Sequence, residues 1–204
     1  MTMQIDAASA RCYIFCAHLC EKGSSMQPLQ FLTGNKNKLA EAQAILPGIV
    51  GVAIDLPEIQ SLDPKEVIRE KLAVALGRER GPCIVEDTSL ILHCMNGLPG
   101  TLIKWFLETI GAVGIARIAE SFGDSAATAR TMLGYADEHG AIFYFEGVVH
   151  GEIVQPRGVT GFGWDVIFIP EGHDQTFAEM TREEKNMISM RRKAFEALRT
   201  HLQK

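Results

Sequence analysis

Residues 29–38, LQFLTGNKNK, combine a small turn with lysines in an arrangement that could bind a phosphate group. A short apolar run enters the turn Thr33-Gly34-Asn35, and a helix-forming segment that carries Lys38 leaves it. A strand, a tight turn and a helix N-terminus gather free backbone N–H groups and positive charge around an anion. The segment is not a Walker A loop, which needs a second glycine and a lysine followed by serine or threonine. It predicts an anion site, and an ordinary turn with solvated lysines is the alternative interpretation.

Carboxylates form the second group of residues that could do chemistry. Glu86 and Asp87 follow the apolar residues 83–85, and we expect them at the end of a buried strand. Burial of such groups is costly unless a cation or solvent meets them, and their hard oxygen donors suit Mg²⁺. Because neighbours on a strand point to opposite faces, both should not ligate one ion. Glu58 supplies a further carboxylate after another strand, so the pattern indicates a metal site, with helix caps or solvated loops as the alternative.

Three later segments carry residues suited to a ligand. In GLPGTLIKWF, residues 97–106, Lys104 stands near a helix start, where either a bound anion or solvent would balance its charge. In GFGWD, residues 161–165, aromatic rings alternate with glycines, so that a flat ligand could stack there unless the segment is a packed turn. In EKNMISMRRKA, residues 184–194, Lys185 and Arg191 are candidate donors to phosphate and base edges, or part of a solvated basic helix face.

The elements that must position these residues alternate between helix and strand early in the chain and form a hairpin late. This order predicts an α/β fold, a single elongated domain with a mixed central sheet flanked by helices. We expect strands over residues 29–32, 49–54, 83–85, 89–93, 128–135, 142–153 and 166–169. We expect helices over residues 38–46, 64–78 and 102–121, with a break near 111–114, a capped helical turn from Thr181, and a last helix from Ser189 to the C-terminus.

Composition limits the class of protein. The 204 residues are 47% hydrophobic and 22% charged, which is typical of one globular domain. A net charge of −5 argues against general nucleic-acid binding. Five cysteines without a zinc spacing or a disulfide pattern favour the cytoplasm. Residues 1–27 fit neither a secretory signal nor a membrane helix, so we expect a poorly ordered N-terminal extension before a domain of residues 28–204, and the role of Cys12, Cys16 and Cys20 stays open.

In this order, the five segments resemble the inosine triphosphate pyrophosphatase family over about residues 29–198. Thr33, Gly34, Asn35 and Lys38 match its Ser/Thr-Gly-Asn-x-x-Lys motif. The resemblance implies that Glu58 and Asp87 bind the metal and that Asp87 and Lys38 are catalytic. It also implies a substrate-binding set, which comprises Thr33, Gly34, Asn35, Lys36, Asn37, Lys38, Lys71, Asp87, Thr88, Lys104, Phe162, Gly163, Trp164, Asp165, Lys185, Met190 and Arg191.

What the resemblance implies about activity is concrete. The expected enzyme has two lobes around a nucleotide cleft and uses Mg²⁺, with Mn²⁺ as a substitute, to hydrolyse non-standard purine nucleoside triphosphates such as ITP, dITP and XTP. The products are the monophosphate and pyrophosphate, and the reaction cleanses the nucleotide pool. A cytoplasmic homodimer without nucleic-acid or membrane partners is implied. The alternatives are a related pyrophosphatase that acts on other modified nucleotides, and a non-catalytic nucleotide-binding protein.

Two departures from the family pattern concern the base. The family usually has Ser-His-Arg where this chain has Ser189, Met190 and Arg191, and a tyrosine is common at the position of Leu102. We expect Phe162 to stack on the purine and Arg191 to donate to the 6-keto oxygen that hypoxanthine and xanthine carry. Guanine carries the same oxygen, so the loss of the histidine leaves the degree of discrimination against GTP open.

Overall fold

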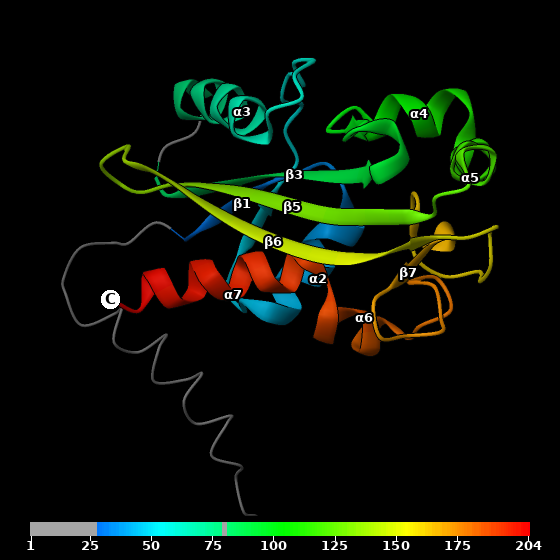
Figure 1. Ribbon diagram of the computed structural model, residues 1–204. Helices are drawn as coiled ribbons and strands as arrows, with labels where there is room; N and C mark the ends of the chain where they lie inside the picture. Colours follow the sequence, from blue (N-terminus) through cyan, green and yellow to red (C-terminus); the bar gives the residue numbers. More distant parts are fainter. Residues whose placement is uncertain (1–27, 79–80) are drawn as a thin grey trace, which may run out of the picture.

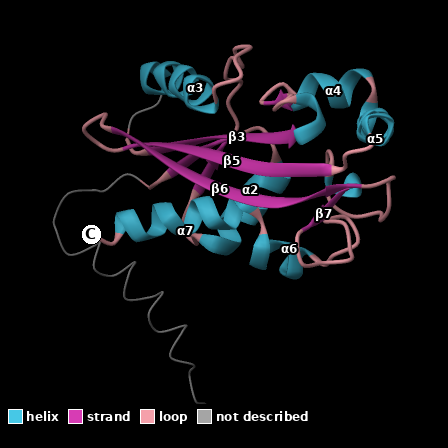
Figure 2. Ribbon diagram, viewed as in Figure 1, coloured by secondary structure: helices cyan, strands magenta, loops and turns pink. Residues whose placement is uncertain are grey.

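The computed structural model describes residues 28–78 and 81–204, and it contains one mixed sheet between two layers of helices (Figures 1 and 2). The strands are β1 (Gln30–Leu32), β2 (Val50–Val52), β3 (Cys83–Leu92), β4 (Pro99–Gly100), β5 (Ala126–Ala136), β6 (Ile142–Ile153) and β7 (Phe168–Pro170). The helices are α2 (Lys36–Ile45), α3 (Pro64–Arg78), α4 (Ile103–Thr109), α5 (Gly111–Phe122), α6 (Arg182–Ile188) and α7 (Met190–Leu202), with short 3₁₀ turns at His93–Met95 and Asp165–Ile167.

The sheet has the strand order β2-β1-β3-β5-β6-β7, and β4 pairs with β3 outside this path. β1 runs parallel to β2 and β3, whereas β3, β5, β6 and β7 are joined by antiparallel ladders. In Figure 1, α3, α4 and α5 lie on one side of the sheet, and α2, α6 and α7 lie on the other. The predicted α/β fold with a mixed central sheet is confirmed.

The prediction of two strands over residues 83–93 is wrong, because β3 is continuous from Cys83 to Leu92. β3 pairs with the antiparallel strand β5 along its whole length, including the acidic residues at which a strand end was expected. The hydrogen bonds of this pairing keep the acidic residues in the extended conformation of the strand. Glu86 and Asp87 therefore lie in the middle of a strand.

The position of the site follows from a difference in strand length. β1 pairs with β3 only at Cys83 and Ile84, and β4 pairs with β3 only at Leu90 and Ile91. Among the described residues, the stretch 85–89 of β3 thus has a strand partner on its β5 side alone. A crevice outside the carboxyl end of a parallel strand is where ligands of open α/β sheets bind.

Smaller shifts of predicted boundaries have local causes. α2 begins at Lys36, two residues before the predicted start, because the Asn35 side chain caps it and accepts from the N–H groups of Asn37 and Lys38. The predicted break in the helix of residues 102–121 is confirmed, since α4 ends before Gly111, which has a φ of 67°. The predicted strand 166–169 is a 3₁₀ turn followed by β7, and the predicted capping box at Thr181 is present.

Buried apolar side chains fix the helices that carry the site. On one face of the sheet Ile68 and Leu72 of α3 pack with Val85, and on the other Ala194 and Phe195 of α7 pack with Ile84. In the parts of the chain that are described, no helix combines the length and apolar character needed to cross a membrane. The expectations for residues 1–27 and their cysteines lie outside the described residues.

Candidate active site

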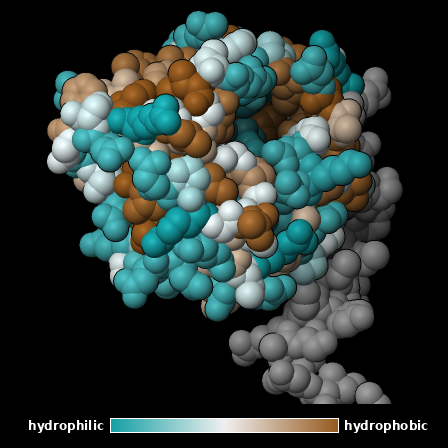
Figure 3. All heavy atoms as spheres, turned by 90° about the vertical axis from the view of Figure 1, so that its right-hand side faces the viewer, coloured by the Kyte–Doolittle hydropathy of each residue, from teal (hydrophilic) through white to brown (hydrophobic). Residues whose placement is uncertain are grey.

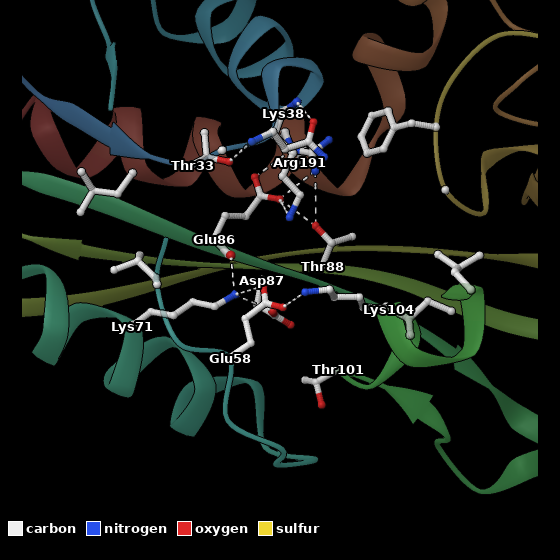
Figure 4. Close-up of a pocket in the computed structure, with 18 of the residues that line it drawn as sticks. Thr33, Lys38, Glu58, Lys71, Glu86, Asp87, Thr88, Thr101, Lys104 and Arg191 are labelled. Atoms are coloured by element: carbon white, nitrogen blue, oxygen red, sulfur yellow. Dashed lines mark hydrogen bonds and ion pairs between the residues drawn. The ribbon is translucent and has the colours of Figure 1, made fainter. Parts of the chain in front are cut away.

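The uncovered stretch of β3 forms the floor of a cleft of about 1040 Å³. Its walls come from the turn after β1, the segment 53–58, α3, α4, residues 162–165, α6 and α7. A hollow with hydrophobic and hydrophilic side chains around it is visible on the face shown in Figure 3. Glu86 and Asp87 project to opposite sides of β3 in Figure 4, as the strand periodicity predicts, so the cleft has two chemically distinct halves.

The turn after β1 forms one end of the cleft. The Thr33 hydroxyl accepts a hydrogen bond from the Asn35 N–H at 3.1 Å, and Asn35 caps α2. Lys38 extends from the first turn of α2, and its Nζ lies 3.3 Å from Glu86 Oε1. The predicted residues Thr33, Gly34, Asn35 and Lys38 line the cleft. Lys36 and Asn37 are exposed and are not among the lining residues.

Lys71 of α3 organises the half of the cleft that contains Asp87. Its Nζ donates to Asp87 Oδ1 at 2.9 Å, to Glu58 Oε1 at 3.2 Å and to the Glu86 carbonyl oxygen at 3.2 Å. Burial opposes the charge of Lys71, but the two carboxylates outweigh it and raise its pKa. Burial likewise opposes the charge of Glu58, but Lys71 and Lys104 lower its pKa, so Glu58 is a carboxylate at neutral pH.

Asp87 and Glu58 fit a hard divalent cation. Asp87 Oδ2 is buried and has no hydrogen-bond partner, although a buried carboxylate oxygen without one is unfavourable. Glu58 and Asp87 both contact the Lys71 ammonium group, so one ion could reach both side chains. In the described part of the chain, no group of three or more His, Cys, Asp or Glu side chains is placed to hold a metal. Ligand phosphates and water would have to complete the coordination, which is how Mg²⁺ is usually bound.

Arg191 and Glu86 dominate the other half of the cleft. Arg191 is fully buried, and its Nε and Nη2 donate to the two oxygens of Glu86 at 2.8 and 2.7 Å in a bidentate pair. Nη1 donates to Glu41, and Nη2 also reaches the Thr88 hydroxyl at 3.3 Å. Burial disfavours both charges, but the pair outweighs it: the pKa of Glu86 is lowered and that of Arg191 is raised. Four of the five guanidinium N–H groups are thus engaged, and the second N–H of Nη1 has no partner in the described part of the chain.

Lys185 of α6 connects this half of the cleft to residues 161–165. Its Nζ lies 2.7 Å from Asp165 Oδ2 and 3.1 Å from Glu41 Oε1. Asp165 Oδ2 also accepts from the Phe162 N–H at 2.8 Å, and Lys185 Nζ lies 4.6 Å from the centre of the Phe162 ring. Burial raises the pKa of Asp165 even though Lys185 opposes this effect. The Phe162 ring is therefore held beside two buried cations, Lys185 and Arg191, and the Cζ of Arg191 lies 5.8 Å from the ring centre.

The two aromatic residues of GFGWD do not have the same role. Both residues line the cleft, but Phe162 is half-buried, whereas Trp164 is buried and packs edge-to-face on Phe168 with ring centres 5.5 Å apart. The expectation of open ring faces is therefore wrong for Trp164, because its ring belongs to the core. Met190 is also buried in that core while it borders the cleft.

Among the residues that the predicted set lacks, three make polar contacts that shape the cleft. Glu41 is buried and contacts both Lys185 and Arg191, and its place on the apolar stripe of α2, next to Ala42, is the signal that could have identified it. The sequence marks Glu86 as an acid but does not indicate that Arg191 is its partner. Thr101 lines the cleft and its hydroxyl donates to the Ser61 carbonyl oxygen, a contact that nothing in the local sequence indicates.

Comparisons with known proteins agree with this fold and site. The Ham1 family matches residues 29–201. An inosine triphosphate pyrophosphatase of Schizosaccharomyces pombe is 45% identical over 182 residues, which cover 87% of this chain and 96% of that protein. Inosine triphosphate pyrophosphatase 1 of Trypanosoma cruzi is 44% identical and covers 88% of this chain, with 94% of that protein matched. The solved structure of a HAM1 protein from Coxiella burnetii has a TM-score of 0.74 and 28% identity, with 87% of this chain and 99% of that one covered.

A cleft at the end of a parallel strand, with lysines along it and two chemically distinct halves, is typical of a nucleotide-binding enzyme with an α/β fold. The match to the family covers nearly all of the described residues and therefore identifies the class of protein. The chain belongs to the Ham1 family.

Proposed function

We propose that this chain is a hydrolase that cleaves non-standard purine nucleoside triphosphates, ITP, dITP and XTP, to the monophosphate and pyrophosphate. The relatives that match it are inosine triphosphate pyrophosphatases. The observation that carries the proposal is the arrangement of charge along β3: Lys71 and the unpaired Asp87 oxygen on one side, and Arg191 with its one remaining donor on the other. A triphosphate and a purine need these two different environments in one cleft. In a cell, the reaction would remove such nucleotides from the pool.

The Asp87 half suits the triphosphate. Lys71 and Lys104 supply positive charge in this half, and Lys38 adds to it from the Glu86 side of β3. Of the N–H groups of residues 33–35, that of Gly34 is left for a phosphate beside the first turn of α2, since those of Thr33 and Asn35 donate to the Val52 carbonyl oxygen and the Thr33 hydroxyl. Glu58 and Asp87 would hold Mg²⁺, or Mn²⁺ in its place, and a bound ion would polarise the phosphate oxygens and neutralise the developing charge. Asp87 would also accept a proton from the attacking water through its free oxygen. Lys71 holds the other oxygen of Asp87 and so fixes the direction of the free one.

The Arg191 half suits the base. Phe162 offers a ring on which a purine can stack, with Lys185 beside it. The remaining Nη1 N–H of Arg191 would donate to a 6-keto oxygen, whereas the 6-amino group of adenine presents a donor to that position. Met190 gives an apolar wall without hydrogen-bonding capacity. Base recognition in this proposal therefore depends on Arg191, with Glu41 and Glu86 holding its guanidinium plane.

The proposal extends to the chain as a whole. The family match begins at residue 29, so we assign the catalytic domain to residues 28–204 and leave residues 1–27 outside it. We also propose a homodimer, in which residues 98–106 contribute to the contact because Trp105 of α4 is 48% exposed.

Identification of the products tests the proposed bond cleavage. With ITP and Mg²⁺, we expect equal amounts of IMP and pyrophosphate, because the charge in the cleft is placed to stabilise pyrophosphate as the leaving group. Anion-exchange chromatography for the nucleotide and ³¹P NMR for the phosphate species would measure this. IDP with inorganic phosphate as the products would contradict the proposal.

A further inference from the structure

The first turn of α7 lies directly on β6 at Gly147. A Cβ atom at Gly147 would lie 2.8 Å from the Ala194 amide nitrogen and closer still to the Met190 carbonyl oxygen. Both are backbone atoms, which cannot rotate away as a side chain can. Gly147 has no positive φ that would itself call for glycine. The absence of a side chain at this position is therefore required by the close approach of the helix rather than by the conformation of the strand.

This contact determines the position of the Arg191 backbone, because Arg191 follows Met190 in the same helical turn. Two further contacts hold the turn: Ser189 caps it and accepts from the Arg192 N–H at 3.2 Å, and Lys193 Nζ donates to the Val148 carbonyl oxygen at 2.7 Å. The other end of the Arg191 side chain is fixed by the bidentate pair with Glu86 on β3. A buried side chain held at both ends has little slack when its backbone moves outward.

We propose that Gly147 is a positioning residue for base recognition. By bringing α7 close to β6, it sets the depth at which the Arg191 guanidinium group lies in the cleft. Gly147 does not line the cleft, so it acts through Arg191 and does not touch the ligand. The inference rests on the proposed function, in which Arg191 distinguishes a 6-keto purine from adenine.

The same hairpin offers a matched control on its other face. A Cβ at Gly134 of β5 would meet the ends of two α3 side chains, with Leu72 Cδ1 at 2.8 Å and Ile68 Cγ2 closer. The Leu72 end can rotate, whereas Ile68 Cγ2 moves only with its whole branched side chain. Both contacts are to side chains, not backbone, and lie on the opposite side of the sheet from α7. Gly134→Ala therefore introduces the same methyl group into the same hairpin without a contact to the helix that carries Arg191.

The experiment compares kcat/KM for ITP and for ATP in the wild type, Gly147→Ala and Gly134→Ala, with melting temperatures recorded for each. A displacement of about 1 Å at a reacting or recognising group costs up to about a hundredfold in rate, so we expect Gly147→Ala to lower the ITP-to-ATP ratio about tenfold or more. The fall should come from ITP alone, because ATP makes no use of the Arg191 donor. Gly134→Ala should keep the ratio of the wild type. A folded Gly147→Ala protein with the wild-type ratio would overturn the proposal.

A substitute variant and the preference of the wild type complete the test. If Gly147→Ala does not fold, Lys193→Met replaces it, since Lys193 is exposed and its substitution removes one hydrogen bond from the same turn. We expect a fall in the ratio of about twofold to tenfold, which corresponds to one net hydrogen bond. An unchanged ratio in that variant overturns the role of the α7 contact. A wild type without any preference for ITP over ATP overturns the proposed function itself, whereas a preference retained by the variants overturns only the inference about Gly147.

Discussion

Replacement of Asp87 by asparagine is expected to lower the turnover of ITP about a hundredfold or more. The substitution keeps the shape of the side chain but removes its charge and its capacity to accept a proton. Asp87 Oδ2 is the buried oxygen that has no protein partner, and Oδ1 contacts Lys71 at 2.9 Å. Loss of the negative charge weakens the hold on a divalent cation, and because the remaining amide oxygen would accept from Lys71, the NH2 group would replace the oxygen that is offered to the cation.

The measurement is kcat for pyrophosphate release at saturating ITP across a series of Mg²⁺ concentrations. We expect a lower kcat and a higher Mg²⁺ requirement, while the melting temperature shows that the fold is intact. Glu70→Gln is the control. The substitution removes a carboxylate next to Lys71 on α3, and Glu70 does not line the cleft. Turnover by Asp87→Asn close to that of the control would contradict the assignment of Asp87.

Replacement of Arg191 by lysine is expected to remove most of the preference for ITP over ATP. Lysine keeps a positive charge between Glu41 and Glu86, but it lacks the planar fork of donors that the pair with Glu86 uses. A hydrogen bond from a charged donor contributes about 1.5–3 kcal/mol, so the ITP-to-ATP ratio of kcat/KM should fall about tenfold to a hundredfold. Alanine is the less informative variant, since it would take the shared guanidinium partner from two buried carboxylates, Glu41 and Glu86, and leave them only Lys185 and Lys38 as cationic partners. Removal of one member of such a buried network destabilises the fold by about 3–5 kcal/mol.

Arg192→Lys is the matched control for this prediction. Arg192 is the next residue of α7, is half-buried and pairs with Glu196 at 2.9 Å outside the cleft. Its replacement should leave both the rate and the preference as in the wild type. A folded Arg191→Lys protein that prefers ITP as strongly as the wild type would show that the base is recognised by other residues.

The local parts of the site could be predicted from the sequence. The turn at Thr33-Gly34-Asn35 and the cap of α2 depend on residues within a few positions of one another, and the structure has them there. The long β5–β6 hairpin was also predicted, because its apolar residues and polar turn lie in one continuous segment. Such features are set by short-range backbone chemistry, which a single sequence displays.

The ion pairs across the cleft could not be predicted, because they join distant segments. Arg191 pairs with Glu86 and Glu41, which are 105 and 150 residues away in the chain. Several acids and bases of this sequence could pair in other combinations, and only the folded sheet decides among them. The continuity of β3 through Glu86 and Asp87 has the same origin, since it depends on pairing with β5. Trp164 was assigned an open ring for a similar reason: the core residues that cover it, such as Phe168, could not be identified from spacing.

The central claim is that the cleft hydrolyses non-standard purine triphosphates with the help of a divalent cation. The most direct test is pyrophosphate release from ITP, XTP, GTP and ATP by the full chain, each measured with Mg²⁺ and with a chelator. We expect rapid release from ITP and XTP with Mg²⁺, slower release from ATP, and loss of release in the chelator. Equal rates for ITP and ATP, or release that continues without a divalent cation, would contradict it.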